Sequence, residues 1–112
     1  MRERRVTSDD VELYVVEAGD PGRAAILFLH GFPDCHGVWR SQMEALADEF
    51  HVIAFDMRGV GRSTRSRHAR DYAMDYLVAD VAAVIDATRG PGGRVHLVGH
   101  DWGSVIGWSF VA

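Results

Sequence analysis

The chain has 112 residues, 47% of them hydrophobic and 25% charged, which is typical of one ordinary globular domain rather than a disordered or fibrous protein. Its formal net charge is −4 and its twelve basic residues are all arginines, so no overall basic surface for binding nucleic acid is expected. The one cysteine, Cys35, cannot close an intrachain disulfide, and no Cys/His spacing predicts a zinc site.

The apolar runs are far shorter than the roughly 18 residues of a membrane span, and the charged N-terminus lacks the apolar run of a signal peptide. We therefore expect a cytoplasmic protein that needs no metal or cofactor and binds neither nucleic acid nor membrane. The sequence does not indicate an oligomeric state.

The first half of the chain predicts a β-hairpin, a strand, a helix and another strand. Short strand patterns at residues 5–7 and 11–16 are separated by turn-forming residues, which favours a hairpin. The continuous apolar run at 24–29 predicts a strand buried on both faces. Apolar residues then recur at three- and four-residue steps over 39–50, which predicts a helix, and 52–55 predicts a second buried strand.

The second half repeats the alternation of helix and strand. An amphipathic helix is predicted from Met74 to at least Ile85, closed by the glycines of residues 90–93. A strand at 95–98 and a helix at 104–112, apolar nearly all round, follow. This order predicts an α/β fold, a mostly parallel sheet with helices on both faces that starts with a β-hairpin.

The segment between the last predicted strand and helix carries the most specific chemical signal. In Gly99-His100-Asp101-Trp102-Gly103, two glycines flank a central aspartate, the pattern of a nucleophile elbow. Such a turn is too sharp for side chains at its flanks, and its apex projects into the active site. The start of the following helix also favours a partly buried, ionised carboxylate at Asp101.

An aspartate at the apex points to particular chemistry. A carboxylate with an ordinary pKa of about 3.9 is ionised at neutral pH and needs no base to activate it. It can attack a saturated carbon in a strained ring or one bearing a halide, and the ester formed can be cleaved by water. The alternative is that Asp101 merely caps the helix in a structural turn.

Two further segments resemble the epoxide-hydrolase branch of the α/β-hydrolases. The stretch His30-Gly31-Phe32-Pro33 is similar to that family's HGxP motif. The resemblance implies that Asp101 is the nucleophile, that the backbone amides of Phe32 and Trp102 form the oxyanion hole, and that the Phe32–Pro33 bond is cis. It also implies supporting roles around the site for His30, Gly31, Pro33, Gly99, His100 and Gly103, with both histidines fixing loop geometry.

The stretch from Asp56 to Ser63 resembles the DxRGxGxS segment of the same family, and we interpret it as a structural, glycine-dependent loop. A phosphate-binding loop is disfavoured because Thr64 stands where GxGxxG needs its third glycine. The polar stretch from Arg58 to Arg70, with five arginines, is either a solvated loop or a site for an anionic substrate or a partner.

Within this branch the resemblance favours an epoxide as the small-molecule substrate. Haloalkane dehalogenases share the Asp-Trp pair but commonly carry a halide-binding asparagine where this chain has Phe32. Dehalogenation remains the alternative reaction, and a non-catalytic remnant or partner-binding module is the alternative class of function.

The order of catalytic residues in this fold is nucleophile, acid and then histidine, and residues 102–112 contain no Asp, Glu or His. We therefore expect residues 1–112 to be the N-terminal part of a core domain, truncated in the helix after the elbow, with the cap domain downstream. As given, the chain is expected to form an ester that persists, because no histidine base activates water. An open edge strand and an uncovered final helix are expected to lower its solubility.

Overall fold

The chain begins with the predicted β-hairpin. In the computed structural model, which describes residues 1–112, β1 (Arg2–Ser8) pairs antiparallel with β2 (Val11–Ala18). Asp9 in the turn between them has φ 55°, a left-handed conformation that aspartate adopts more readily than most residues. Both strands extend beyond the predicted bounds because their register continues as far as the pair Arg2 and Glu17.

The hairpin joins a sheet with the strand order β1-β2-β4-β3-β5. The strands β3 (Ala25–Leu29), β4 (His51–Phe55) and β5 (His96–Gly99) run parallel, and β4 pairs antiparallel with β2. Every residue of β3 and β4 is buried, as the continuous apolar runs predict. Because the three strands are parallel, the loops after them emerge at one edge of the sheet.

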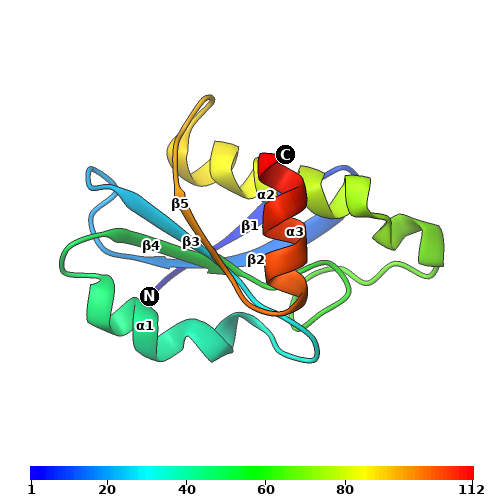
Figure 1. The fold of residues 1–112 in the computed structure, drawn as a ribbon, viewed down its shortest axis with the longest axis horizontal. Helices are drawn as coiled ribbons and strands as arrows, with labels where there is room; N and C mark the ends of the chain where they lie inside the picture. Colours follow the sequence, from blue (N-terminus) through cyan, green and yellow to red (C-terminus); the bar gives the residue numbers. More distant parts are fainter.

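Helices cover both faces of this sheet (Figure 1). A 3₁₀ turn, η1 (His36–Trp39), and α1 (Arg40–Leu46) lie on one face, whereas α2 (Met74–Arg89) and α3 (Trp102–Val111) lie on the other. A second 3₁₀ turn, η2 (Ala69–Tyr72), precedes α2. The core accordingly divides into a larger cluster under α2 and α3 and a smaller one under α1. No helix combines the length and the hydrophobicity that crossing a membrane requires.

The first helix is shorter than predicted, because α1 occupies seven residues, Arg40–Leu46, of the predicted 39–50. The apolar periodicity is nevertheless real, since Trp39, Leu46, Ala47 and Phe50 pack against the core cluster that contains Met43. The apolar periodicity indicates which residues face the sheet, and such residues continue beyond α1 into the turn that leads to β4.

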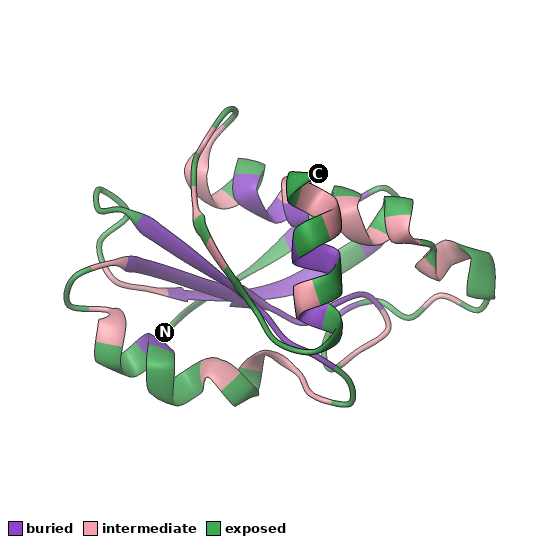
Figure 2. Ribbon diagram, in the orientation of Figure 1, coloured by how far each residue is buried: buried purple, intermediate pink, exposed green.

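Burial decreases towards the last strand and helix (Figure 2). β5 pairs only with β3, and three of its four residues are exposed. The final helix is apolar but not enclosed, because Val105, Trp108 and Val111 are exposed, with Trp108 at 75%. The expected open edge strand and uncovered final helix are thus both present.

A buried ion pair connects the loop after β4 to α2 and β1. The guanidinium of Arg58 donates to both carboxylate oxygens of Asp80, from Nε to Oδ2 at 2.7 Å and from Nη2 to Oδ1 at 2.8 Å. The hydroxyl of Ser8 donates to the same carboxylate at 2.6 Å, and both charged side chains are at most 3% exposed. The charges compensate each other, so removing one leaves the other buried without its counter-ion.

We predict that Arg58→Met lowers the free energy of unfolding by about 3 kcal/mol or more, because Asp80 loses its buried partner. Urea unfolding followed by circular dichroism measures the change. The matched control is Arg62→Met, whose guanidinium is 67% exposed and lies 3.8 Å from an exposed Glu3, so its effect should stay within about 1 kcal/mol. Equal effects of the two substitutions would contradict the assignment of Arg58.

Candidate active site

The turn between β5 and α3 has the backbone geometry of a strained elbow. Asp101, at its apex, has φ 58° and ψ −124°, a conformation that non-glycine residues rarely adopt. The Ser104 and Val105 amides donate back to the Asp101 carbonyl, so the helix starts directly behind the apex. The strained residue is therefore the one that the sequence pattern marks as the nucleophile.

The glycines around this elbow are needed for close packing of backbone. A Cβ on Gly99 would lie 2.6 Å from the carbonyl oxygen of Gly103, and a Cβ on Gly103 would lie 2.7 Å from that of His30. A Cβ on Gly31 would lie 2.5 Å from the Cβ of Asp101. The His30-Gly31 loop thus passes against the elbow so closely that only glycine fits on both sides.

This close approach brings the Phe32 amide to the Asp101 carboxylate. The Phe32 N–H donates to Asp101 Oδ2 with an N–O distance of 3.0 Å. This bond, followed by one from the Trp102 amide, lowers the pKa of Asp101 from its usual value of 3.8. The two amides expected to face one point therefore act on the same carboxylate. Asp101 is fully exposed in this chain rather than partly buried, because no segment lies over the elbow.

His30 holds the loop that carries the Phe32 amide. Its buried ring accepts a hydrogen bond from the Met57 N–H at Nε2, at 3.0 Å, and its Nδ1 lies 2.9 Å from the Gly31 carbonyl oxygen. Since Nε2 accepts, the proton is on Nδ1, and the ring fixes the loop as expected. The expected cis bond joins Phe32 to Pro33. By contrast, only the backbone of His100 contributes, through its N–H to the Leu29 carbonyl.

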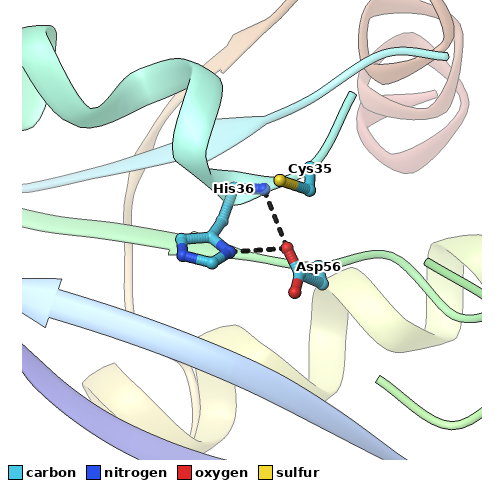
Figure 3. A group of neighbouring side chains, drawn as sticks. All are labelled: Cys35, His36 and Asp56. Atoms are coloured by element: carbon cyan, nitrogen blue, oxygen red, sulfur yellow. Dashed lines mark hydrogen bonds and ion pairs between the residues drawn. The ribbon is translucent and has the colours of Figure 1, made fainter. Parts of the chain in front are cut away.

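The Asp56–Ser63 segment forms the structural loop that its sequence predicts. Asp56, buried at the end of β4, accepts hydrogen bonds from the His36 N–H and ring Nδ1 at Oδ1 and from the Arg62 N–H at Oδ2 (Figure 3). Burial raises the pKa of Asp56, but these bonds outweigh it and the pKa is lowered. The Ser63 hydroxyl donates to the Asp56 carbonyl, and Gly61 has φ 53°, so the loop needs glycine there.

A cavity of about 530 Å³ opens beside the elbow. Its lining includes both amide-bearing residues, Phe32 and Trp102, and is otherwise largely apolar. Asp101 is not part of the lining, but its carboxylate accepts a hydrogen bond from the N–H of Phe32, which is a lining residue. The cavity has the size of a small-molecule site.

Charged side chains at this cavity have different roles. Arg58 is committed to Asp80, whereas Arg65 and Asp34 line the cavity without a side-chain hydrogen bond or ion pair to the chain. Most of the predicted polar stretch 58–70 is exposed. A solvated loop thus describes it best, except that the buried pair formed by Arg58 was not predicted.

The other histidines lie away from the elbow or in structural positions. His51 is fully buried, and its Nε2 lies 2.6 Å from Glu17 Oε1. The other carboxylate oxygen of Glu17, Oε2, pairs with Arg4 Nε at 2.5 Å. His68 and His96 are exposed. His51 is thus a core residue, whereas His68 and His96 are surface residues.

The sheet order and the elbow between β5 and α3 are the features of an α/β-hydrolase core. A family model described as the alpha/beta hydrolase fold matches residues 24–112. The chain therefore belongs to the α/β-hydrolase fold family, as its sequence motifs indicate.

Among characterised relatives, the chain is similar to epoxide hydrolases. It is 43% identical to epoxide hydrolase A of Mycobacterium tuberculosis over 96% of its own length and 33% of that protein. It is 36% identical to mouse epoxide hydrolase 4 over 93% of its length and 28% of that protein. The crystal structure of an epoxide hydrolase from Vigna radiata superposes with a TM-score of 0.90 at 36% identity, covering 97% of this chain and 34% of the other. The chain thus spans about a third of the length of these relatives.

Sequence reasoning missed two groups of residues around the site. The Arg58 and Asp80 pair joins residues 22 positions apart, and Cys35 and His36 lie beside Asp56, which follows a different strand. The expected parallel order of β3 and β4 places the loops after these strands next to each other, which was a signal for the second group only; no sequence pattern marks the Arg58–Asp80 pair. Cys35, His36 and Asp56 are also the group that could hold a metal ion.

We predict that Gly103→Ala lowers the free energy of unfolding by about 1–3 kcal/mol, because its Cβ would meet the backbone carbonyls of Leu29 and His30. The control, Gly107→Ala, lies in the same helix, and its Cβ would meet only side-chain atoms, of Leu97 at 3.3 Å and of Leu29 at 3.6 Å. That substitution should be neutral or stabilise the chain by up to about 1 kcal/mol. Urea midpoints measure both, and a tolerated Ala at 103 would refute the close approach.

Proposed function

We propose that this chain supplies the nucleophile and the oxyanion-binding amides of an epoxide hydrolase. The observation that carries the proposal is the carboxylate of Asp101 at the strained apex, with Oδ2 held by the Phe32 amide. A carboxylate oriented in this way can present its other oxygen to an electrophilic carbon. The names of the similar proteins favour an epoxide as that electrophile.

In the proposed reaction, Asp101 Oδ1 attacks the less hindered carbon of the epoxide and the carbon–oxygen bond of the ring breaks. The ring oxygen takes a proton from an acid elsewhere in the parent protein, and an alkyl ester forms on Asp101. A water molecule activated by a histidine base then attacks the ester carbonyl. The Phe32 and Trp102 amides stabilise the resulting oxyanion, and the diol leaves.

Residues 1–112 would on this proposal form the first part of the core domain, and the remainder of the parent would provide the acid, the base and the cap. The basis is that the relatives are about three times as long as this chain. The supporting residues have structural roles in this proposal. Gly31, Gly99 and Gly103 permit the close approach of the His30-Gly31 loop to the elbow, whereas His30, Pro33 and His100 shape the loops around the amides.

Release of halide from a haloalkane is the second candidate reaction. It is favoured by the indole of Trp102, which is 53% exposed and whose N–H makes no hydrogen bond within the chain. It is disfavoured by Phe32, whose side chain has no donor for a halide. Comparing halide release with diol formation in the parent protein separates the two reactions.

We predict that a reactive terminal epoxide forms a covalent adduct on Asp101 and that Asp101→Ala abolishes it. Mass spectrometry of the intact chain and of its peptides measures the adduct. Asp34→Asn is the matched control, because it removes a carboxylate from the cavity beside the elbow and should leave the adduct in place. An unchanged adduct in the Asp101 variant would remove this residue from its proposed role.

We also predict that alkylation of Asp101 persists in acid. The reactive form is the ionised carboxylate, and because the pKa of Asp101 is lowered, that form survives at a pH where an ordinary aspartate is protonated. An aspartate-containing peptide in the same solution serves as reference. The protein-to-peptide ratio of alkylation should rise as the pH falls through about 4. A ratio that stays constant or falls over this range would show that the pKa is not lowered.

A further inference from the structure

Three side chains with metal-binding atoms meet beside the active-site loops. Cys35 and His36 lie at the start of η1, shortly after the Phe32–Pro33 turn, and Asp56 lies at the end of β4. One ligand atom from each residue lies within 4.8 Å of the other two. Figure 3 shows the group, with the His36 backbone nitrogen and Nδ1 both directed at one oxygen of Asp56.

The Asp56 carboxylate has no permanent cation as a partner. It is 1% exposed, and its only ion-pair partner is the ring of His36, at 2.6 Å, which is charged only when protonated. The Arg62 side chain is directed instead to Glu3 and the Tyr14 hydroxyl. This contrasts with Asp80, whose charge is matched by Arg58. A buried carboxylate without a fixed counter-charge favours a cation next to it.

The Cys35 thiol is also uncommitted. It is half-buried and makes no hydrogen bond within the chain. Thiolate, imidazole and carboxylate are the ligands that zinc prefers, with bond lengths of about 2.0–2.3 Å, which places ligand atoms roughly 3.5 Å apart around a tetrahedral ion. From the present geometry, the 2.6 Å contact between His36 Nδ1 and Asp56 Oδ1 has to widen by about 1 Å, and Cys35 Sγ has to settle at the same spacing. The partly exposed Cys35 and His36 side chains can make these movements by rotation.

We propose that Cys35, His36 and Asp56 form a binding site for a zinc-type divalent ion, with water as the fourth ligand. The ion replaces the proton between His36 Nδ1 and Asp56 Oδ1, so the His36 ring carries its proton on Nε2 and the thiol releases its proton to solvent. The His36 and Arg62 backbone bonds to Asp56 remain. The bound ion ties the loop that carries the Phe32 amide to the loop after β4.

The single cysteine makes the test specific to this site. The purified, reduced 112-residue chain is titrated with Co²⁺, and the thiolate-to-cobalt charge-transfer absorption in the near ultraviolet is recorded. Because Cys35 is the only source of thiolate, the band can arise at no other place. We expect saturation at one equivalent, loss of the band on addition of Zn²⁺, and no band with Cys35→Ser.

The role of His36 is tested with a matched pair of variants. His36→Gln should weaken cobalt binding at least tenfold, whereas His68→Gln, which changes an exposed histidine, should leave it unchanged. Zn²⁺ should also slow alkylation of Cys35 by iodoacetamide at least tenfold, and a chelator should restore the rate. The His36 variant should lose this protection.

Absence of the band in the unaltered chain, or equal binding by the His36 and His68 variants, overturns the proposal. Asp56→Asn should weaken binding as well. If circular dichroism shows that this variant does not fold, the comparison of His36→Gln with His68→Gln still tests the proposed site. Formation of the epoxide adduct on Asp101 is measured separately and does not depend on this site, so the two proposals fail or succeed independently.

Discussion

The contact between the Phe32 amide and the Asp101 carboxylate constrains most of the residues around it. Residues 69 positions apart meet there, and their backbones approach so closely that Gly31 and Gly103 can carry no side chain. Asp101 adopts a strained backbone conformation, and the His30 ring fixes the loop that carries the Phe32 amide through its contacts with Gly31 and Met57. The His30–Pro33 and Gly99–Gly103 motifs therefore contain the residues that the contact between these two loops requires.

Three aspartates of this chain have three different sets of partners. Asp80 is buried and has a full counter-charge in Arg58, which also ties α2 to the sheet. Asp56 is buried and has only backbone amides and a histidine, which together lower its pKa despite burial. Asp101 is exposed, and its pKa is lowered first by the Phe32 and Trp102 amides and less by the charge of His100. Only the last leaves the carboxylate free to react, because a guanidinium on both oxygens would block attack.

The sequence alone predicted the elements that depend on local patterns. The apolar runs of β3 and β4 and the period of α2 identify buried strands and an amphipathic helix, and the glycine-flanked Asp101 identifies the elbow. Side-chain pairs between distant segments could not be found in this way, because the Arg58–Asp80 and His36–Asp56 contacts have no periodic signature. The end of α1 was also misjudged, since residues beyond Leu46 face the core without being helical. The exposure of Asp101 depends on whether another segment covers the elbow, and a local sequence pattern does not indicate this.

The strand order decides which pairing brings the two halves of the site together. β4 lies between β2 and β3, and β5 pairs on the other side of β3 alone. The register of that pairing, Leu29 opposite Gly99, sets the elbow against the loop that follows β3. A shift of β5 by one residue along β3 would therefore leave the other strands paired and separate the Asp101 carboxylate from the Phe32 amide.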